Sequence, residues 1–243
     1  MSKKHRARFV ALASLVAARC PTLRVEQALV TGRVLVDGRV LTNPAARVRA
    51  DASIKVLPER RLRGETKLTH ALSTFDVQLI GRVAIDLGAS AGGFTSALLA
   101  AGARRVYAID AGVGQLVGRL RLDPRVVNLE GHNLGAITTT DVPHPVDVVT
   151  MDLSYLPIAM AAAQLDRFRF AEVADLISLV KPTFELHRGE LACLREEVEE
   201  AVGTANTALR GQRWCILGTT PAPRTGRRGA PEVFLHARRH RVL

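Results

Sequence analysis

Acids and lysines stand at several points of this sequence where an apolar run meets a polar loop. Asp152 follows the run 146–151, Lys181 follows the run 176–180, and Glu232 precedes the last apolar run. In an open α/β sheet the ends of the strands form the ligand crevice, so Asp152 and Lys181 are expected to flank it. A carboxylate beside a lysine can hold or move a proton there. The alternative for each residue alone is a solvated cap at a strand end.

A glycine-rich segment, 86–95 (D-L-G-A-S-A-G-G-F-T), follows an apolar run and precedes an apolar, helix-compatible stretch. Its glycines are expected to let a ligand approach the backbone at a helix N-terminus. A second acid, Asp110, ends the next apolar run, 22 residues after Gly88. An acid at the end of the second strand of a nucleotide-binding sheet accepts hydrogen bonds from ribose hydroxyls.

The spacing of these glycines indicates which nucleotide binds. A dinucleotide-binding loop reads G-x-G-x-x-G, but Ser90 occupies the position of the middle glycine. The pattern D-x-G-x-x-x-G-G instead resembles the first motif of methyltransferases that bind S-adenosylmethionine; the alternative is an ordinary glycine-rich turn. The cofactor contacts expected from this resemblance and from the strand ends are Asp86, Gly88, Ala89, Ser90, Gly92, Gly93, Phe94, Asp110, Asn133 and Asp152.

Charge is distributed unevenly along the 243 residues, whose formal net charge is +11. Residues 1–66 carry 14 Lys and Arg against 5 Asp and Glu, whereas residues 67–209 carry 12 against 17. A basic N-terminal segment suggests binding of a polyanion, most simply RNA or DNA. The alternative is a solvated, arginine-rich surface, because Arg outnumbers Lys 29 to 5.

The composition does not support a membrane-spanning protein or a cysteine-based metal site. No apolar run approaches the roughly 20 residues that a membrane-spanning helix needs. The three cysteines are too few and too far apart for a metal knuckle or a disulfide framework, so reduced cysteines in a cytoplasmic protein are expected.

From residue 67 onward, apolar runs alternate with helix-like segments. This alternation predicts an α/β domain with a Rossmann-like, mostly parallel sheet of seven strands. The expected strands are 83–88, 105–110, 125–130, 146–153, 174–181, 213–219 and 232–237. A Glu-rich helix is expected over 190–209, before the last two strands.

The N-terminal residues 1–57 predict a small α+β domain, followed by a linker over 58–66 and the larger domain over 67–243. Helices are expected over 9–18 and 25–30, and a hairpin about the Asp-Gly turn at 37–38. A closing strand is expected over 52–57. The block Arg24-x-x-x-Ala-Leu-x-x-Gly-Arg33-Val-x-Val-Asp-Gly38 resembles the S-four-type RNA-binding domain, which implies RNA contacts by Arg24, Arg33 and Arg39.

Ordered segments along nearly the whole chain resemble the TlyA family of RNA ribose 2′-O-methyltransferases, which joins an S-four-type domain to an FtsJ-like catalytic domain. The segments are Arg63-Gly-x-x-Lys67-Leu68, Asp86-x-Gly-Ala-Ser-x-Gly-Gly-Phe-Thr95, Asp110-x-Gly-x-Gly-Gln-Leu116, Asp123-Pro-Arg-Val126, Asp152-x-Ser154 and Lys181-Pro-x-Phe-Glu185. The resemblance implies a catalytic set of Lys67, Asp152, Lys181 and Glu232. The loop 221–231 and the run 155–157 depart from the family's pattern, which leaves the substrate open.

The resemblance implies S-adenosylmethionine-dependent 2′-O-methylation of ribosomal RNA, with ribosomal RNA or ribosomal subunits as partners and no metal. Lys181 is the expected general base, Asp152 orients it, and Lys67 with Glu232 holds the ribose. One alternative is an inactive RNA-binding or ribosome-assembly factor that has kept the fold. Another, from the family's haemolysin label, is a membrane-active protein, for which the sequence offers no strongly amphipathic basic helix. The nucleotide, the RNA and the oligomeric state stay open.

Overall fold

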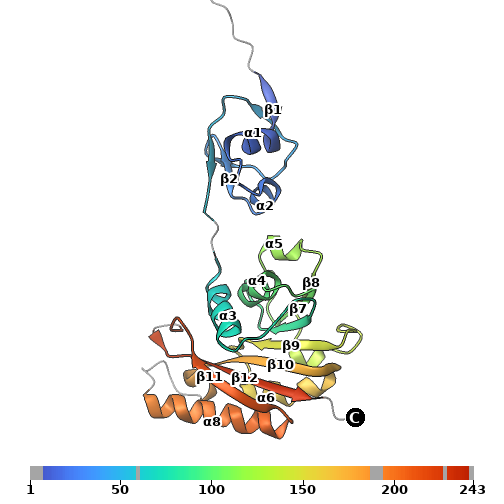
Figure 1. Ribbon diagram of the computed structural model, residues 1–243, viewed down its shortest axis with the longest axis vertical. Coiled ribbons are helices and arrows are strands. Elements are labelled where there is room, and N and C mark those ends of the chain that lie inside the picture. Colours follow the sequence, from blue (N-terminus) through green and yellow to red (C-terminus); the bar gives the residue numbers. More distant parts are fainter. Residues whose placement is uncertain (1–7, 59–60, 187–193, 227–228, 241–243) are drawn as a thin grey trace, which may run out of the picture. The chain divides into compact units, whose positions relative to one another are not determined.

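The computed structural model describes residues 8–58, 61–186, 194–226 and 229–240 (Figure 1). The chain divides into two compact units, residues 1–60 and 61–243. Each unit has a hydrophobic core of its own. One core is built from Leu12, Val16, Leu29 and Val34 in the first unit, and two larger clusters fill the second.

The first unit contains two short helices and two small sheets. Its elements are β1 (Phe9–Ala11), α1 (Leu12–Arg19), α2 (Val25–Val30), β2 (Val34–Val36), β3 (Arg39–Val40), β4 (Arg47–Arg49) and β5 (Ile54–Val56). The expected hairpin is present: β2 pairs with β3 across Asp37 and Gly38, whose φ angles are 47° and 81°. Positive φ at both central residues is what a tight two-residue hairpin turn requires.

The beginning of this unit differs from the sequence prediction. Phe9 was expected to start a helix, but Phe9–Ala11 is a strand paired with β4, and α1 begins only at Leu12. The strand Arg47–Arg49 had no sequence prediction either. Val10 and Val48 are register partners that both contribute to the core, so pairing satisfies the backbone while it buries two β-branched side chains.

The second unit is built on a seven-stranded sheet, as predicted. Its strands are β6 (Val83–Leu87), β7 (Arg105–Asp110), β8 (Val126–Glu130), β9 (Val146–Met151), β10 (Phe170–Val180), β11 (Cys215–Pro221) and β12 (Val233–His240). Their order is β11-β12-β10-β9-β6-β7-β8, and β12 runs antiparallel to both of its neighbours. The order reverses between β6 and β9, which is where ligands bind in sheets of this type.

Helices cover both faces of this sheet (Figure 1). They are α3 (Arg63–Thr74), α4 (Gly93–Ala100), α5 (Gly118–Arg121), α6 (Ile158–Ala162), α7 (Pro182–Glu185) and α8 (Arg195–Gly211), with 3₁₀ turns at Leu134–Ala136 and Leu165–Arg167. Side chains of α3, α4 and α5 belong to one core cluster, and those of α6 and α8 to the other. The helix expected over 190–209 corresponds to α8; residues 190–193 lie outside the described part.

Helix α3 corrects the expected linker. Residues 63–66 form its first turn and therefore belong to the second unit. A Cβ built on Gly93 would lie 2.7 Å from Cα of Gly64, so the first turns of α3 and α4 touch through two glycines. This contact fixes where α3 begins beside the sheet, and with it the position of Lys67 one turn later.

A buried carboxylate joins β10 and β12 to the residue that precedes β6. Asp175 is 1% exposed and accepts hydrogen bonds from Arg82 Nη1 at 2.8 Å, His236 Nε2 at 2.9 Å and Arg238 Nε at 2.9 Å. Burial acts to raise the pKa of Asp175, but the bonds from His236, Arg238 and Arg82 outweigh it and lower the pKa below its usual range. The carboxylate is therefore held ionised inside the sheet.

We expect Asp175→Ala to lower the free energy of unfolding by about 3 kcal/mol, because it leaves two guanidinium groups without their buried partner. Since the pKa is depressed in the folded state, the stabilisation is present above the unfolded pKa of about 3.9 and is lost as pH falls below it. Urea unfolding at pH 7 and pH 3.5 should therefore show a smaller difference between wild type and variant at the lower pH. A difference that is equal at both values would contradict this account.

Candidate active site

The four residues of the expected catalytic set come from elements that meet at one edge of the sheet. Asp152 follows β9 and Lys181 follows β10, two neighbouring parallel strands. Glu232 precedes β12, which runs the other way, and Val233 is the register partner of Val180. The antiparallel strand thus brings an acid from the far end of the chain next to Lys181.

Lys181 and Asp152 form an ion pair at this edge. The Nζ of Lys181 lies 2.5 Å from Asp152 Oδ1, 3.0 Å from the carbonyl oxygen of Leu153 and 2.8 Å from Ser154 Oγ. The side chains of Lys181 and Asp152 are 17% and 26% exposed, so solvent can still reach them. The carboxylate and the carbonyl only accept hydrogen bonds, whereas the Ser154 hydroxyl can accept or donate. Ser154 is thus the one of these three partners that can also donate a hydrogen bond.

Lys67 and Glu232 form a second, more buried ion pair. Nζ of Lys67 contacts Oε2 of Glu232, and the two side chains are 12% and 7% exposed. The loop before β12 folds back on this acid: the amide of Ala222 donates to the Glu232 carbonyl at 2.9 Å. A Cβ on Gly226 would lie 2.4 Å from Glu232 Oε1, so a side chain there would displace this carboxylate. The loop that departs from the family pattern still encloses an acid.

At two positions of the 86–95 loop, the missing glycine side chain makes room for neighbouring backbone. Gly88 has φ +82°, and a Cβ on it would lie 2.6 Å from the carbonyl oxygen of Asp152. Gly93 meets Gly64 at the start of α3. Gly92, with φ +93°, caps α4 and faces Leu120. Substitution at any of the three would push neighbouring elements apart.

Asp86, Ala89 and Phe94 were expected to contact the cofactor, but their side chains are buried. Asp86 is fully buried, and its two carboxylate oxygens accept hydrogen bonds from Thr95 Oγ1 at 2.6 Å and Thr150 Oγ1 at 2.9 Å. Burial raises the pKa of Asp86 to about 6. Ala89 and Phe94 are 5% and 3% exposed. The side chains of these three residues lie beneath the loop rather than on its surface.

Asp110, at the end of β7, is the half-exposed acid of this crevice. Its oxygens accept hydrogen bonds from the backbone amides of Ser90 at 2.8 Å and Gly112 at 2.7 Å. Each carboxylate oxygen has a second lone pair, so the group can still accept hydrogen bonds from a ligand. Asn133 is exposed at the start of the 3₁₀ turn after β8. Asp110 and Asn133 thus follow two adjacent strands.

Glu130 is a positioning residue whose role the sequence did not reveal. Its carboxylate accepts hydrogen bonds from the amides of Gln115 at 2.5 Å and Leu116 at 2.8 Å, and from Arg121 Nη2 at 3.0 Å. It therefore anchors the loop that follows Asp110. In the sequence, the signal for this role was an acid at the end of the third strand. The structure places that acid beside the loop residues Gln115 and Leu116. Ser154 was likewise visible only as part of the motif Asp-x-Ser.

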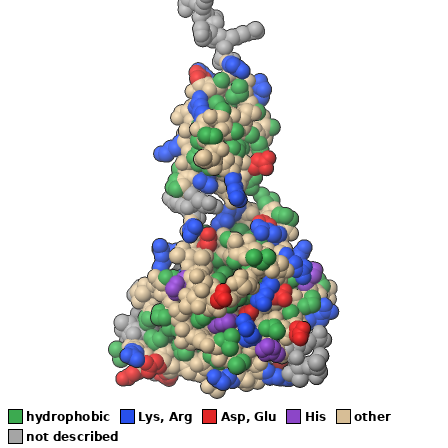
Figure 2. Space-filling view, in the orientation of Figure 1, with side chains coloured by type: hydrophobic (Ala, Val, Ile, Leu, Met, Phe, Trp, Pro, Cys, Tyr) green, Lys and Arg blue, Asp and Glu red, His purple; other side chains and the backbone are tan. Residues whose placement is uncertain are grey.

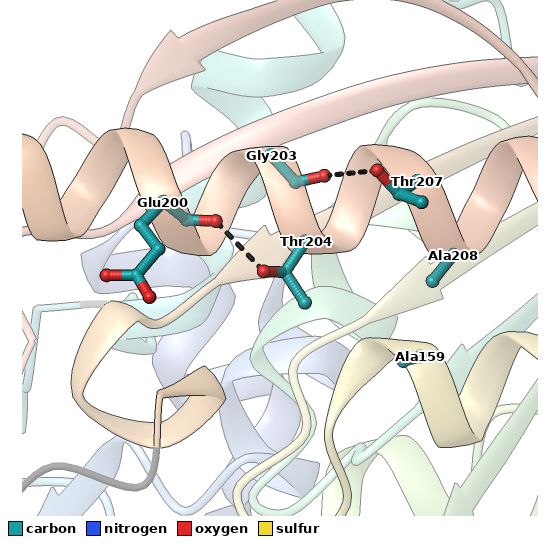
Figure 3. A pocket seen from close by; sticks show the side chains of 6 residues that line it. All are labelled: Ala159, Glu200, Gly203, Thr204, Thr207 and Ala208. Atoms are coloured by element: carbon teal, nitrogen blue, oxygen red, sulfur yellow. Dashed lines mark hydrogen bonds between the residues drawn. The ribbon is translucent and has the colours of Figure 1, made fainter.

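An open pocket of about 580 Å³ lies elsewhere, on α8 and α6. It is lined by Ala159, Glu200, Gly203, Thr204, Thr207 and Ala208 (Figure 3). The hydroxyls of Thr204 and Thr207 donate to carbonyls one turn earlier in α8, at 3.0 Å each (Figure 3). The walls are therefore mainly methyl groups and backbone, and they contain none of the expected catalytic side chains.

The three arginines expected to bind RNA have different environments in the first unit. Arg24 and Arg39 are exposed, at the start of α2 and in β3. Arg33 is half-buried, and its Nε donates to the carbonyl oxygen of Leu57 at 2.9 Å, so this side chain also braces the end of the unit. Lys and Arg side chains are spread over the visible face of this unit (Figure 2).

Within the described ranges, no three His, Cys, Asp or Glu side chains are grouped so that they could hold a metal ion. Across the same ranges, no helix has the length and apolar character that crossing a membrane requires.

Comparisons with known proteins identify relatives of this chain. The 16S/23S rRNA (cytidine-2′-O)-methyltransferase TlyA of Mycobacterium tuberculosis is 36% identical over 216 residues, which cover 85% of this chain and 80% of the relative. Hemolysin A of Brachyspira hyodysenteriae is 30% identical over 88% of this chain and 92% of its own. A solved structure of a hemolysin-named protein from Streptococcus thermophilus superposes with a TM-score of 0.70 at 24% identity, over 97% of this chain and 90% of that chain.

Residues 60–236 match the FtsJ-like methyltransferase family, which covers the whole sheet unit up to β12. This match spans most of the chain, and the identity to TlyA extends over both units. The chain therefore belongs to the FtsJ-like methyltransferases and, among them, to the TlyA group.

Proposed function

We propose that this protein transfers the methyl group of S-adenosylmethionine to a ribose 2′-hydroxyl of ribosomal RNA. The observation that carries the proposal is the pairing of Lys181 with Asp152 at the edge of the sheet where the glycine-rich loop begins. Lys67 and Glu232 lie in a second pair, joined to the first by the register of β10 and β12. The relative TlyA is named for methylation of the same ribose hydroxyl at cytidines of 16S and 23S rRNA.

The chemistry of the crevice suits the cofactor. The half-exposed Asp110 is free to accept hydrogen bonds from ribose hydroxyls, and Asn133 follows the next strand toward the adenine side. Backbone of Gly88 to Gly92 forms the wall nearest to the Asp152 carbonyl. The bound cofactor would supply a methyl group on a sulfonium sulfur, which leaves as a neutral thioether without further activation.

Lys181 is the proposed general base. A ribose 2′-hydroxyl is a weak nucleophile and must give up its proton to a base as it attacks; in this proposal the base is the unprotonated amine of Lys181. Asp152 and the Leu153 carbonyl accept hydrogen bonds from two N–H groups of Lys181 and hold Nζ in place. The third position on Nζ, which faces Ser154 Oγ, is the one that would accept the proton of the ribose hydroxyl. Lys67 and Glu232 hold the ribose, and positioning supplies much of the rate.

The first unit is the proposed RNA-holding domain of the S-four type, with Arg24 and Arg39 as exposed cationic contacts. The second unit is the proposed catalytic domain. A ribosomal substrate would place the protein in the cytoplasm.

The cofactor assignment is tested at Asp110. We expect Asp110→Ala to weaken S-adenosylmethionine binding at least tenfold, because a lost charge-assisted hydrogen bond costs roughly 1.5–3 kcal/mol. Asp123→Ala is the matched control, since Asp123 pairs with Arg125 outside the crevice and should bind normally. Isothermal calorimetry measures both. A wild-type protein that binds no S-adenosylmethionine, or prefers NADH, would end the methyltransferase proposal.

The general base is tested by Lys181→Arg and Lys181→Ala. An arginine keeps the charge but stays protonated near neutral pH, so both variants should lose about 100-fold or more in single-turnover methylation of ribosomal RNA, with cofactor binding within a few-fold of wild type. Ser154→Ala, which removes one contact to Lys181, should cost only a few-fold. An active Arg variant refutes the base assignment. A wild type inactive on every ribosomal RNA substrate would favour the inert binding factor.

The role of the first unit is tested by replacing Arg24 and Arg39 together with Ala. Each arginine that contacts a phosphate releases counterions, so the double variant should flatten the dependence of RNA affinity on salt by up to about two units of slope. Cofactor binding should not change. Filter binding from 50 to 300 mM salt measures the slope, and an unchanged slope would mean that these side chains are only solvated.

A further inference from the structure

The two-stranded ribbon of β1 and β4 has one buried and one exposed face. Val10 and Val48 are register partners that pack on the core of the first unit. Phe9 pairs with Arg49, and Ala11 pairs with Arg47. Because side chains alternate along a strand, these four residues share the opposite face.

This exposed face carries an aromatic ring and two arginines, Arg47 and Arg49. Phe9 is 49% exposed. Arg47 is exposed and reaches across the ribbon, where its Nη2 donates to the Phe9 carbonyl oxygen at 2.9 Å. Its register partner Ala11 is small, so the arginine side chain has room to lie along this face.

Arg49, the register partner of Phe9, donates two hydrogen bonds to Asp51, from Nε at 2.9 Å and from Nη2 at 2.6 Å, yet it remains exposed to solvent. The side chains of Arg49 and Asp51 are 58% and 68% exposed. Water and salt screen an ion pair that is this exposed. A phosphate can therefore compete with Asp51 for the Arg49 guanidinium.

We propose that the face formed by Phe9, Ala11, Arg47 and Arg49 binds an unpaired nucleotide of the RNA substrate, with the base stacked on Phe9 and flanking phosphates on the two arginines. Aromatic rings flanked by cations bind single strands in this way. The face belongs to a different sheet from Arg39 and a different element from Arg24. The proposal rests on RNA being the substrate, and it adds a second contact surface to the first unit.

Stacking is tested with the full-length protein, a labelled 12-nucleotide oligoadenylate and a 12-base-pair RNA duplex. Phe9→Leu keeps an apolar side chain but removes the ring, so affinity for oligoadenylate should fall about fivefold or more. Affinity for the duplex, whose bases are already stacked, should stay within twofold. Thermal unfolding of the variant must match wild type; Phe9→Tyr, which retains a ring, should restore binding.

The two charges are tested by variants with opposite expected effects. Arg47→Ala should weaken binding of both RNAs, whereas Lys55→Ala should have a smaller effect, because Lys55 is an exposed cation of the same unit on the other sheet. Asp51→Asn should tighten binding about twofold or more, since it frees Arg49. Equal losses for Arg47→Ala and Lys55→Ala, with no effect of Phe9→Leu, would overturn the proposal.

Two further outcomes separate this proposal from the proposed function. If Phe9→Leu leaves oligoadenylate binding intact while wild type methylates ribosomal RNA, the enzyme proposal stands and the ribbon surface is refuted. If wild type neither binds S-adenosylmethionine nor methylates RNA, yet binds oligoadenylate in a Phe9-dependent way, the ribbon surface stands alone. Phe9-dependent binding to anionic lipid vesicles but not to oligoadenylate would assign the ring to a membrane and overturn the RNA proposal.

Discussion

The catalytic unit depends on one close backbone contact, between Gly88 at the end of β6 and the carbonyl of Asp152 at the end of β9. These two strands flank the point where the order of the sheet reverses. Without a side chain at Gly88, the glycine-rich loop lies directly against the segment that carries Asp152. Any larger residue would move the glycine-rich loop away from the acid that holds Lys181. The proposed cofactor site and the proposed base therefore depend on the same contact between β6 and β9.

Electrostatic pairing is the second constraint at this edge. Each lysine of the expected catalytic set has a carboxylate partner, Asp152 for Lys181 and Glu232 for Lys67. Paired charges can be partly withdrawn from water at lower cost than isolated ones. The Lys181 pair remains more exposed than the Lys67 pair, which suits a group that exchanges a proton with substrate. The more enclosed pair suits a group that holds position.

Two buried acids, Asp175 and Asp86, stabilise the fold and lie outside the two lysine–carboxylate pairs. Asp175 fixes Arg82, His236 and Arg238 within the sheet, and Asp86 is bound by two threonine hydroxyls beneath the glycine-rich loop. Both acids are buried, yet their surroundings shift their pKa values in opposite directions. Asp175 has cationic partners that favour its ionised form, whereas Asp86 has only neutral hydroxyls against the penalty of burial. Neither acid needs to reach a ligand in order to shape the site.

The sequence by itself determined the seven strands, the hairpin at Asp37-Gly38 and the strand-end positions of Asp110, Asp152 and Lys181, because apolar periodicity and turn residues act locally. The pattern could not show that Phe9–Ala11 pairs with a strand 38 positions later, or that residues 63–66 start a helix against Gly93. Nor could it show which glycines face backbone, that Asp86 is enclosed, or that Arg33 is committed to Leu57. Those outcomes depend on contacts between residues far apart in the chain, and only tertiary packing selects among them.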